Sequence, residues 1–240
     1  MDQWREWWQG GRSVAARKLR TSKLRTAIPN PGLFFAEPVQ IFSQLFFLGA
    51  IRPYVNVQWG HDWSRLYGVM SYWDATIRIN PQRPLHKSSP EAILCTLLHE
   101  MLHFFFGAYS CPGSRRDGCC DANICAFLNG GAASHGRAWM HMAKSIEDEM
   151  PRLLGFTGRL GRQECAISEI RKFGFRPSAC DLRSAAYYDI EVAVRIHLRT
   201  SYDDLETVVR SRGRSVLPQT TGKRARRRRT IGICEKLVVV

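Results

Sequence analysis

The run His99-Glu100-Met101-Leu102-His103 has the residue types and the spacing of a catalytic zinc site. Residues four apart lie on one face of a helix, so His99 and His103 can bind one Zn²⁺ through their imidazoles. Glu100 would lie beside the metal without binding it. From there it can take a proton from a water that the metal activates and pass it to the leaving amine. The run therefore predicts a metal-dependent peptidase with one catalytic Zn²⁺ ion.

The residues around this run predict a buried helix. Ser88 or Ser89 can cap its start, and Pro90 suits its first turn. Its positions through Phe105 are apolar on almost every side, which is typical of a helix inside a domain. Burying three ionisable side chains there is costly unless they are paired or bind a metal. Two core histidines bonded to backbone carbonyls are the purely structural alternative.

A catalytic zinc usually has a third protein ligand, and several residues compete for that role. The metzincin spacing needs Gly and His where this chain has Phe106 and Tyr109, so that class is excluded. A glutamate of residues 147–149 is one candidate, although these acids near a helix end are more typical of a solvated face. His135 opens the next predicted helix and is the preferred ligand. His141, on the same helix, is the fallback.

These residues resemble the SprT-like metallopeptidases, the family of the bacterial SprT proteins and the eukaryotic Spartan proteases. His135-Gly136-Arg137-Ala138-Trp139 is similar to the family's third-ligand segment, and it follows the HExxH run in the right order. Four earlier segments resemble the family's opening helix and three strands: 41–47, 55–59, 66–72 and 75–80.

The resemblance covers about residues 38–150. It implies an α+β, zincin-like fold in which a small three-stranded sheet packs with the HExxH helix and a second ligand-bearing helix. The residue pattern beyond 155 adds C-terminal helices to this fold. The resemblance also implies that His99, His103 and His135 hold the zinc and that Glu100 is the general base.

The function implied by the resemblance is that of a zinc-dependent endopeptidase. By analogy, its protein substrates would be DNA-associated or crosslinked to DNA, which is a role in DNA–protein crosslink repair. The chain lacks the Cys-x-x-Cys pairs of the family's C-terminal zinc ribbon and any recognisable Spartan-type partner motif. Two alternatives remain open: a nucleic-acid or chromatin-binding protein with a structural zinc and no protease activity, and a peptidase unrelated to DNA.

A candidate donor for the developing oxyanion is also needed for amide hydrolysis. Tyr67, Tyr72 and Arg137 are the candidates. The sequence does not choose among them.

The net charge of +14 resides in the two ends of the chain. Residues 1–30 carry +5 and residues 210–240 carry +9, so the region between them is neutral. Attraction to phosphate would therefore come from the ends. Six basic residues form the sharpest run: Lys223, Arg224, Arg226, Arg227, Arg228 and Arg229. This run predicts DNA binding or nuclear import, with a solvated tail as the alternative. We expect a nuclear location, and otherwise a cytoplasmic one.

The chain is long enough for one core with extensions. We expect a basic, Trp-containing extension over 1–30, a SprT-like zinc peptidase domain over 31–155, a helical C-terminal extension of the core over 156–210 and a basic, disordered tail over 211–240. Within the third segment, residues 177–200 are predicted to form one helix. No run of 18 apolar residues exists, so we expect no membrane span. The oligomeric state is not indicated.

Four of the eight cysteines lie between the predicted ligands: Cys111, Cys119, Cys120 and Cys125. Because the N-terminus lacks the apolar core of a secretory signal, we expect reduced thiols. A disulfide and a second, structural zinc site are the alternatives. Gly130-Gly131 is a predicted hinge just before His135.

Overall fold

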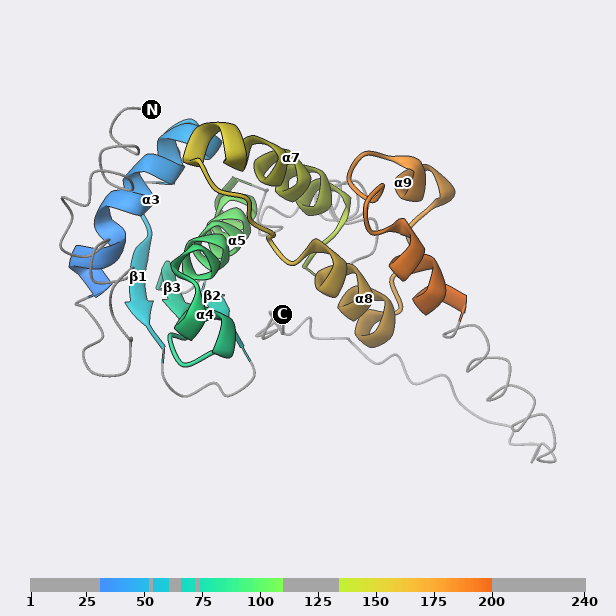
Figure 1. Ribbon diagram of the computed structural model, residues 1–240, viewed down its shortest axis with the longest axis horizontal. Coiled ribbons are helices and arrows are strands. Elements are labelled where there is room, and N and C mark those ends of the chain that lie inside the picture. The colour runs from blue at the N-terminus through green and yellow to red at the C-terminus, as the bar shows by residue number, and fades with distance from the viewer. Residues whose placement is uncertain (1–30, 52–53, 61–65, 72–73, 110–133, 200–240) are drawn as a thin grey trace, which may run out of the picture.

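The computed structural model describes residues 31–51, 54–60, 66–71, 74–109 and 134–199 (Figure 1). It has an α+β architecture, as the sequence predicts. Its labelled elements are α3 (Pro31–Phe47), β1 (Asn56–Trp59), β2 (Gly68–Ser71), β3 (Thr76–Ile79), α4 (Pro84–Ser88), α5 (Pro90–Tyr109), α7 (Arg137–Leu154), α8 (Arg162–Phe173) and α9 (Ala179–Arg183). Residues 191–199 are also helical.

The three strands form one mixed sheet in the order β1-β3-β2. The central strand, β3, runs parallel to β1 and antiparallel to β2. Val57, Ile77 and Ile79 are buried in the core, and such β-branched residues suit a half-buried pleated surface. The small three-stranded sheet and its three predicted strands are thereby confirmed.

Helix α5 is the central element of the fold and begins where the sequence indicates. The backbone N–H of Ala92 donates to Oγ of Ser89 over 3.2 Å, so Ser89 rather than Ser88 supplies the cap. The helix packs against β2, β3, α3, α4 and α7. It continues past Phe105 to Tyr109.

By length and composition, α5 is also the one described helix that could cross a membrane. However, 61% of its qualifying window is buried within the protein. The helix also carries three buried ionisable residues, His99, Glu100 and His103. Its apolar character is therefore explained by its position in the core.

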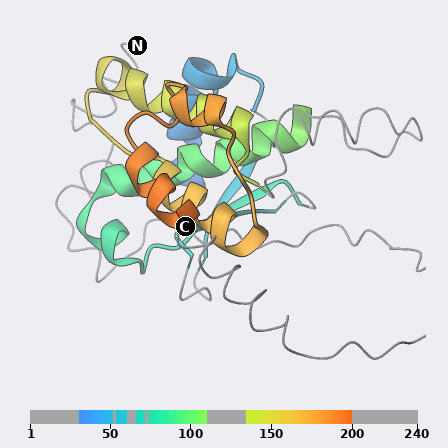
Figure 2. The ribbon, with the colours of Figure 1, turned by 90° about the vertical axis from the view of Figure 1, so that its right-hand side faces the viewer.

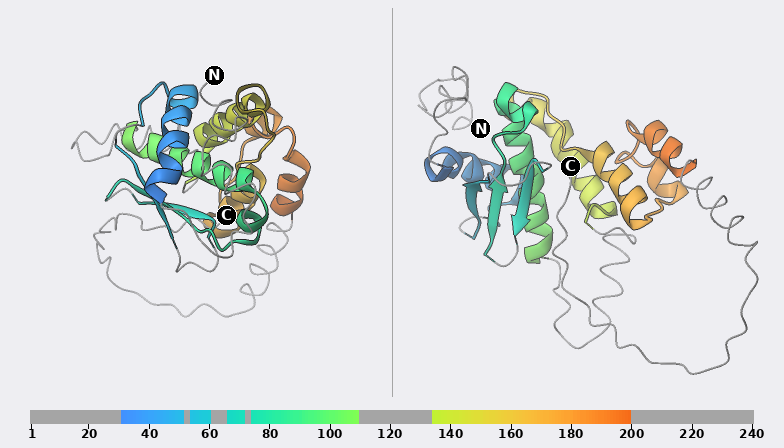
Figure 3. Two further views of the ribbon diagram at one scale, coloured as in Figure 1. Left: turned by 60° about the vertical axis from the view of Figure 1, so that its left-hand side comes forward. Right: turned by 90° about the horizontal axis from the view of Figure 1, so that it is seen from below.

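The sheet lies on one side of α5, and α8 and α9 lie on the other (Figures 1 and 3). Figure 2, seen from the C-terminal helices, shows them in front of α5. One cluster of buried apolar residues includes Phe34 of α3, Ile77 of β3, Leu98 of α5, Ile170 of α8 and Val194. Segments on both sides of residue 155 thus share one core.

The prediction of a single helix over residues 177–200 is wrong. Ser178 and Asp181 form a capping box that starts the short helix α9. The hydroxyl of Ser184 then donates to the carbonyl oxygen of Asp181 over 2.6 Å, and α9 ends at Arg183. Because side chains here bond to the local backbone, a turn separates α9 from the helix over 191–199.

Candidate metal centre

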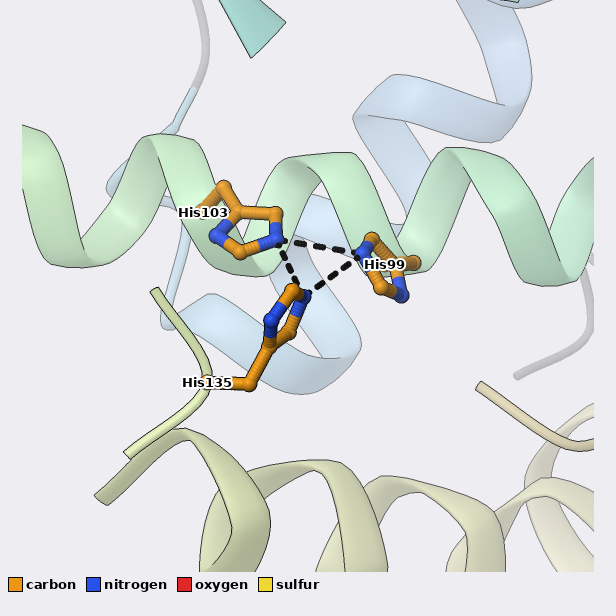
Figure 4. Close-up of side chains that lie close together, drawn as sticks. All are labelled: His99, His103 and His135. Carbon is orange, nitrogen blue, oxygen red and sulfur yellow. Dashed lines mark hydrogen bonds between the residues drawn. The ribbon is translucent and has the colours of Figure 1, made fainter. Parts of the chain in front are cut away.

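Three imidazole rings meet between α5 and the residues that precede α7 (Figure 4). The distances between Nε2 atoms are 3.1 Å from His103 to His99, 3.1 Å from His103 to His135 and 3.4 Å from His99 to His135. His99 and His103 lie one turn apart on α5, as predicted. His135 comes from the other side, since α7 begins only at Arg137.

The triangle of nitrogens has the dimensions of a metal site. Tetrahedral zinc with Zn–N bonds of about 2.0–2.1 Å separates its nitrogen ligands by about 3.3–3.4 Å. The three observed separations, 3.1, 3.1 and 3.4 Å, are close to this spacing. All three residues are buried, and together they could hold a metal ion.

Burial keeps these histidines neutral, which is the state that binds metals. Burial lowers the pKa of His99 to about 4, against a raising contribution from the carbonyl of Leu160. For His103 and His135, burial again is the main cause, and the neighbouring histidines lower their pKa values further. Each ring can therefore offer a lone pair near neutral pH.

Two of the rings are oriented by hydrogen bonds from their second nitrogen. Nδ1 of His99 lies 2.8 Å from the carbonyl oxygen of Leu160, to which it can donate only as the Nδ1–H tautomer. Nδ1 of His135 lies 3.2 Å from Oε1 of Glu169. Both bonds leave Nε2 free to bind a metal, which is the usual arrangement around metal-binding histidines.

Glu100 follows His99 on α5 and is 1% exposed. Burial raises the pKa of its carboxyl to about 8, against the opposing effect of a backbone hydrogen bond at Met70. Its Oε2 atom accepts no hydrogen bond from any described residue. An acid of this kind, beside three possible metal ligands, can exchange a proton near neutral pH.

Gly68 on β2 makes room for Glu100. A Cβ atom at position 68 would lie 2.9 Å from Oε1 of Glu100 and 2.8 Å from Cγ2 of Thr96. Both distances are shorter than real contacts of this kind, so a side chain here would displace the acid or the strand. The strand thus approaches α5 closely where Glu100 projects, which a glycine permits.

Trp139 on α7 contacts all three imidazole rings. Its ring centroid lies 4.5 Å from that of His135, 4.9 Å from that of His99 and 5.8 Å from that of His103. The indole is 1% exposed. It forms an apolar wall that limits the freedom of the rings and keeps water from that side.

A cleft of about 450 Å³ reaches His99 and Glu100 from the first half of α5. Its walls come from Tyr67, α4, α5 and the segment before α8. Ala92, Cys95 and Leu160 give it an apolar interior. The cleft therefore has room for part of a peptide next to the acid.

The structure does not bring the other candidate ligands to the three histidines. His141 is exposed on α7. Glu147 accepts hydrogen bonds from the backbone N–H of Leu160 and from Arg162 over 2.6 and 2.7 Å. Glu149 pairs with Arg152 on the surface, as expected of a solvated face.

The oxyanion candidates have different surroundings. Arg137 donates to both carboxylate oxygens of Asp181, over 2.5 and 3.0 Å, so its guanidinium is already paired. Burial opposes the charge of Asp181, but hydrogen bonds from Arg137 and Ser178 lower its pKa to about 2. Tyr67 lines the cleft, and Tyr72 is not among the described residues.

Several predicted features lie outside the described residues. These are the Trp-containing segment 1–30, the cysteines of 110–133 with Gly130-Gly131, and the basic run 223–229. Three described cysteines, Cys95, Cys165 and Cys180, have free thiols.

The sequence did not predict the roles of Gly68, Leu160 and Glu169 in the candidate site. A glycine inside a strand pattern is a recognised sign of close backbone approach, so Gly68 had a readable signal. The contact of Glu169 with His135 spans 34 residues and has no local signal.

Searches with this chain match no protein-family model, no curated protein and no solved structure.

Proposed function

We propose that this protein is a zinc-dependent endopeptidase of SprT-like type with a zincin-like fold. The observation that carries the proposal is Glu100, a buried acid with a raised pKa, next to three converging histidines. A structural metal would need no such acid. The cleft lined by His99 and Glu100 supports the same hypothesis, because a peptide must reach these residues.

His99, His103 and His135 would hold the ion through Nε2. When bound, Zn²⁺ supplies a Lewis acid that activates a water and polarises the scissile carbonyl. Glu100 would accept the proton of that water on its carboxylate and release it to the leaving amine. A nearby cation favours the ionised carboxylate, so the metal-loaded protein should have Glu100 ready as a base at neutral pH.

The cleft suggests where the peptide would lie. Its apolar interior suits an apolar portion of the substrate, and Glu100 is one of its lining residues. Tyr67 is the oxyanion candidate that lines the cleft, so it is the one we retain. Arg137 is a weaker candidate because Asp181 already holds it.

The rival function, a binding protein with a structural zinc, fits these residues less well. Structural zinc sites are almost always closed by four protein ligands. Among the described residues, the candidate group has three members. A site held by these three histidines alone would leave one position for water or substrate, as catalytic sites do.

We further propose DNA-associated proteins as the substrates, on the strength of the basic run 223–229. Such a run would bring the enzyme to DNA through phosphate contacts. Cleavage of casein by the full chain with and without single-stranded DNA tests this part separately. Stimulation that is lost on deletion of residues 211–240 would support it, and indifference to DNA would leave a general peptidase.

Metal removal and return test the peptidase proposal. We expect the full chain to cleave casein, to lose cleavage after treatment with a chelator, and to recover it at one Zn²⁺ per chain. Cleavage that is unaffected by complete removal of the metal would contradict the proposal. A zinc-loaded protein without cleavage would favour the binding protein.

A further inference from the structure

We infer that Glu169, on helix α8, is the positioning residue for the metal ligand His135. The inference rests on the metal binding in the proposed function, but it does not depend on peptidase activity. It concerns a region beyond the ligands themselves, on a helix that contributes no ligand.

Glu169 holds both the backbone and the ring of His135. Its Oε1 atom accepts from the backbone N–H of Ser134 over 3.0 Å and from that of His135 over 3.1 Å. The same oxygen lies 3.2 Å from Nδ1 of His135. The residue is 1% exposed. A carboxylate is costly to bury, and these three donors offset part of that cost.

This anchor acts at a point where the local chain gives little support. His135 precedes α7, and the N-cap residue of that helix, Gly136, has no side chain that could form a capping bond. Ser134, the residue before His135, donates its backbone N–H to Glu169. The position of the ligand is thus set by a carboxylate 34 residues further along the chain.

The hydrogen bond to Nδ1 also has a chemical effect. A histidine that donates Nδ1–H to a carboxylate must present Nε2 as its lone pair, which is the atom facing His99 and His103. The negative charge increases the basicity of the ring and hence its strength as a ligand. Loss of such a partner typically weakens metal binding about 10–100-fold.

The segment that leads into α8 orients His99 in a similar way. The carbonyl of Leu160 accepts from Nδ1 of His99, while the N–H of Leu160 donates to Glu147. Glu147 is paired with Arg162, the first residue of α8, and both side chains are largely buried. Residues 160–169 therefore orient two of the three ligands.

The test is zinc affinity, measured by competition with a chelating dye on the full chain. Glu169→Gln keeps an oxygen for the two backbone donors but removes the charge, so the fold should persist. We expect zinc binding about 10–100-fold weaker than in the wild type, with a metal-free thermal midpoint close to that of the wild type. The absorption of bound Co²⁺ should also change, because the geometry at His135 is altered.

Two further variants provide the comparison for the loss of zinc affinity. His135→Ala removes the ligand and should weaken binding more than Glu169→Gln does. Glu149→Gln removes an exposed carboxylate that pairs only with a surface arginine in the described contacts, and it should bind zinc as the wild type does.

Wild-type zinc affinity in Glu169→Gln would overturn the inference. So would a loss of affinity that appears only together with a collapse of the metal-free midpoint, since that would indicate a packing role. A wild type that binds zinc but cleaves no casein would refute the proposed function and leave this inference standing.

Discussion

The two sides of α5 contribute differently to the candidate metal centre. Helix α5 supplies His99, Glu100 and His103, and on its sheet side β2 leaves space for the acid at Gly68. On the other side, α7 and α8 surround His135 with Trp139 and Glu169. The residues proposed to act chemically are concentrated in one short run of α5. The groups that orient them come from segments that are distant in the sequence.

This difference shows that a ligand motif is only part of a metal site. The histidines of α5 are fixed relative to each other by one turn of helix. The third histidine has no such frame and depends on the C-terminal helices for its position. Changes in the C-terminal part should therefore affect metal binding as well as stability.

Arg162→Met should have the largest effect on stability. Arg162 is buried and donates to Glu147, to the carbonyl of Ala186 and to Asp189. Its removal leaves the largely buried Glu147 without its cation, so we expect a loss of about 3–5 kcal/mol in the free energy of unfolding. Urea denaturation of the metal-free protein measures it.

Arg195→Met is the matched control, since Arg195 forms an exposed ion pair with Glu191. Such pairs contribute about 0–1 kcal/mol. If both variants lose equally little free energy of unfolding, the buried Arg162 does not hold the C-terminal helices to the site.

Gly68→Ala should have a smaller effect on stability, with its main consequence in catalysis. The added methyl would meet Glu100 and Thr96 at 2.9 and 2.8 Å, so we expect about 1–3 kcal/mol of destabilisation from overpacking. A displaced Glu100 should lower kcat/KM for a peptide substrate about 100-fold. Zinc affinity should change little, because no ligand is touched.

The variant Gly174→Ala separates the effect on stability from the effect on catalysis. No atom lies within 4 Å of an added Cβ at Gly174, although its φ of 68° makes alanine strained there. It should lose stability but keep kcat/KM. Unchanged kcat/KM in Gly68→Ala would mean that Glu100 does not need the space that Gly68 provides.

The features that the sequence predicted have short-range causes. The HExxH spacing, the cap at Ser89 and the apolar strands can each be recognised within a few residues, and the structure has all of them. Helix α3 begins at Pro31, before the predicted segment 41–47, and α5 runs a turn further than expected. Such shifts of helix ends depend on tertiary packing.

The features that were missed have long-range causes or weak local signals. Helix α8 lies within the predicted helical extension 156–210, and Gly174, which has a positive φ, is a readable stop signal for it. The roles of Leu160 and Glu169 are different, because they arise only when α8 packs beside α5 and α7. No spacing within the chain predicts those contacts.

In the proposed mechanism, Glu100 transfers a proton at a metal held by three histidines. The variant Glu100→Gln tests this role, with zinc content and casein cleavage measured on the same preparation. We predict that the variant keeps one zinc per chain and loses at least about 100-fold in cleavage rate, while Glu149→Gln cleaves as the wild type does. Cleavage at the wild-type rate by zinc-loaded Glu100→Gln would show that Glu100 does not transfer the proton.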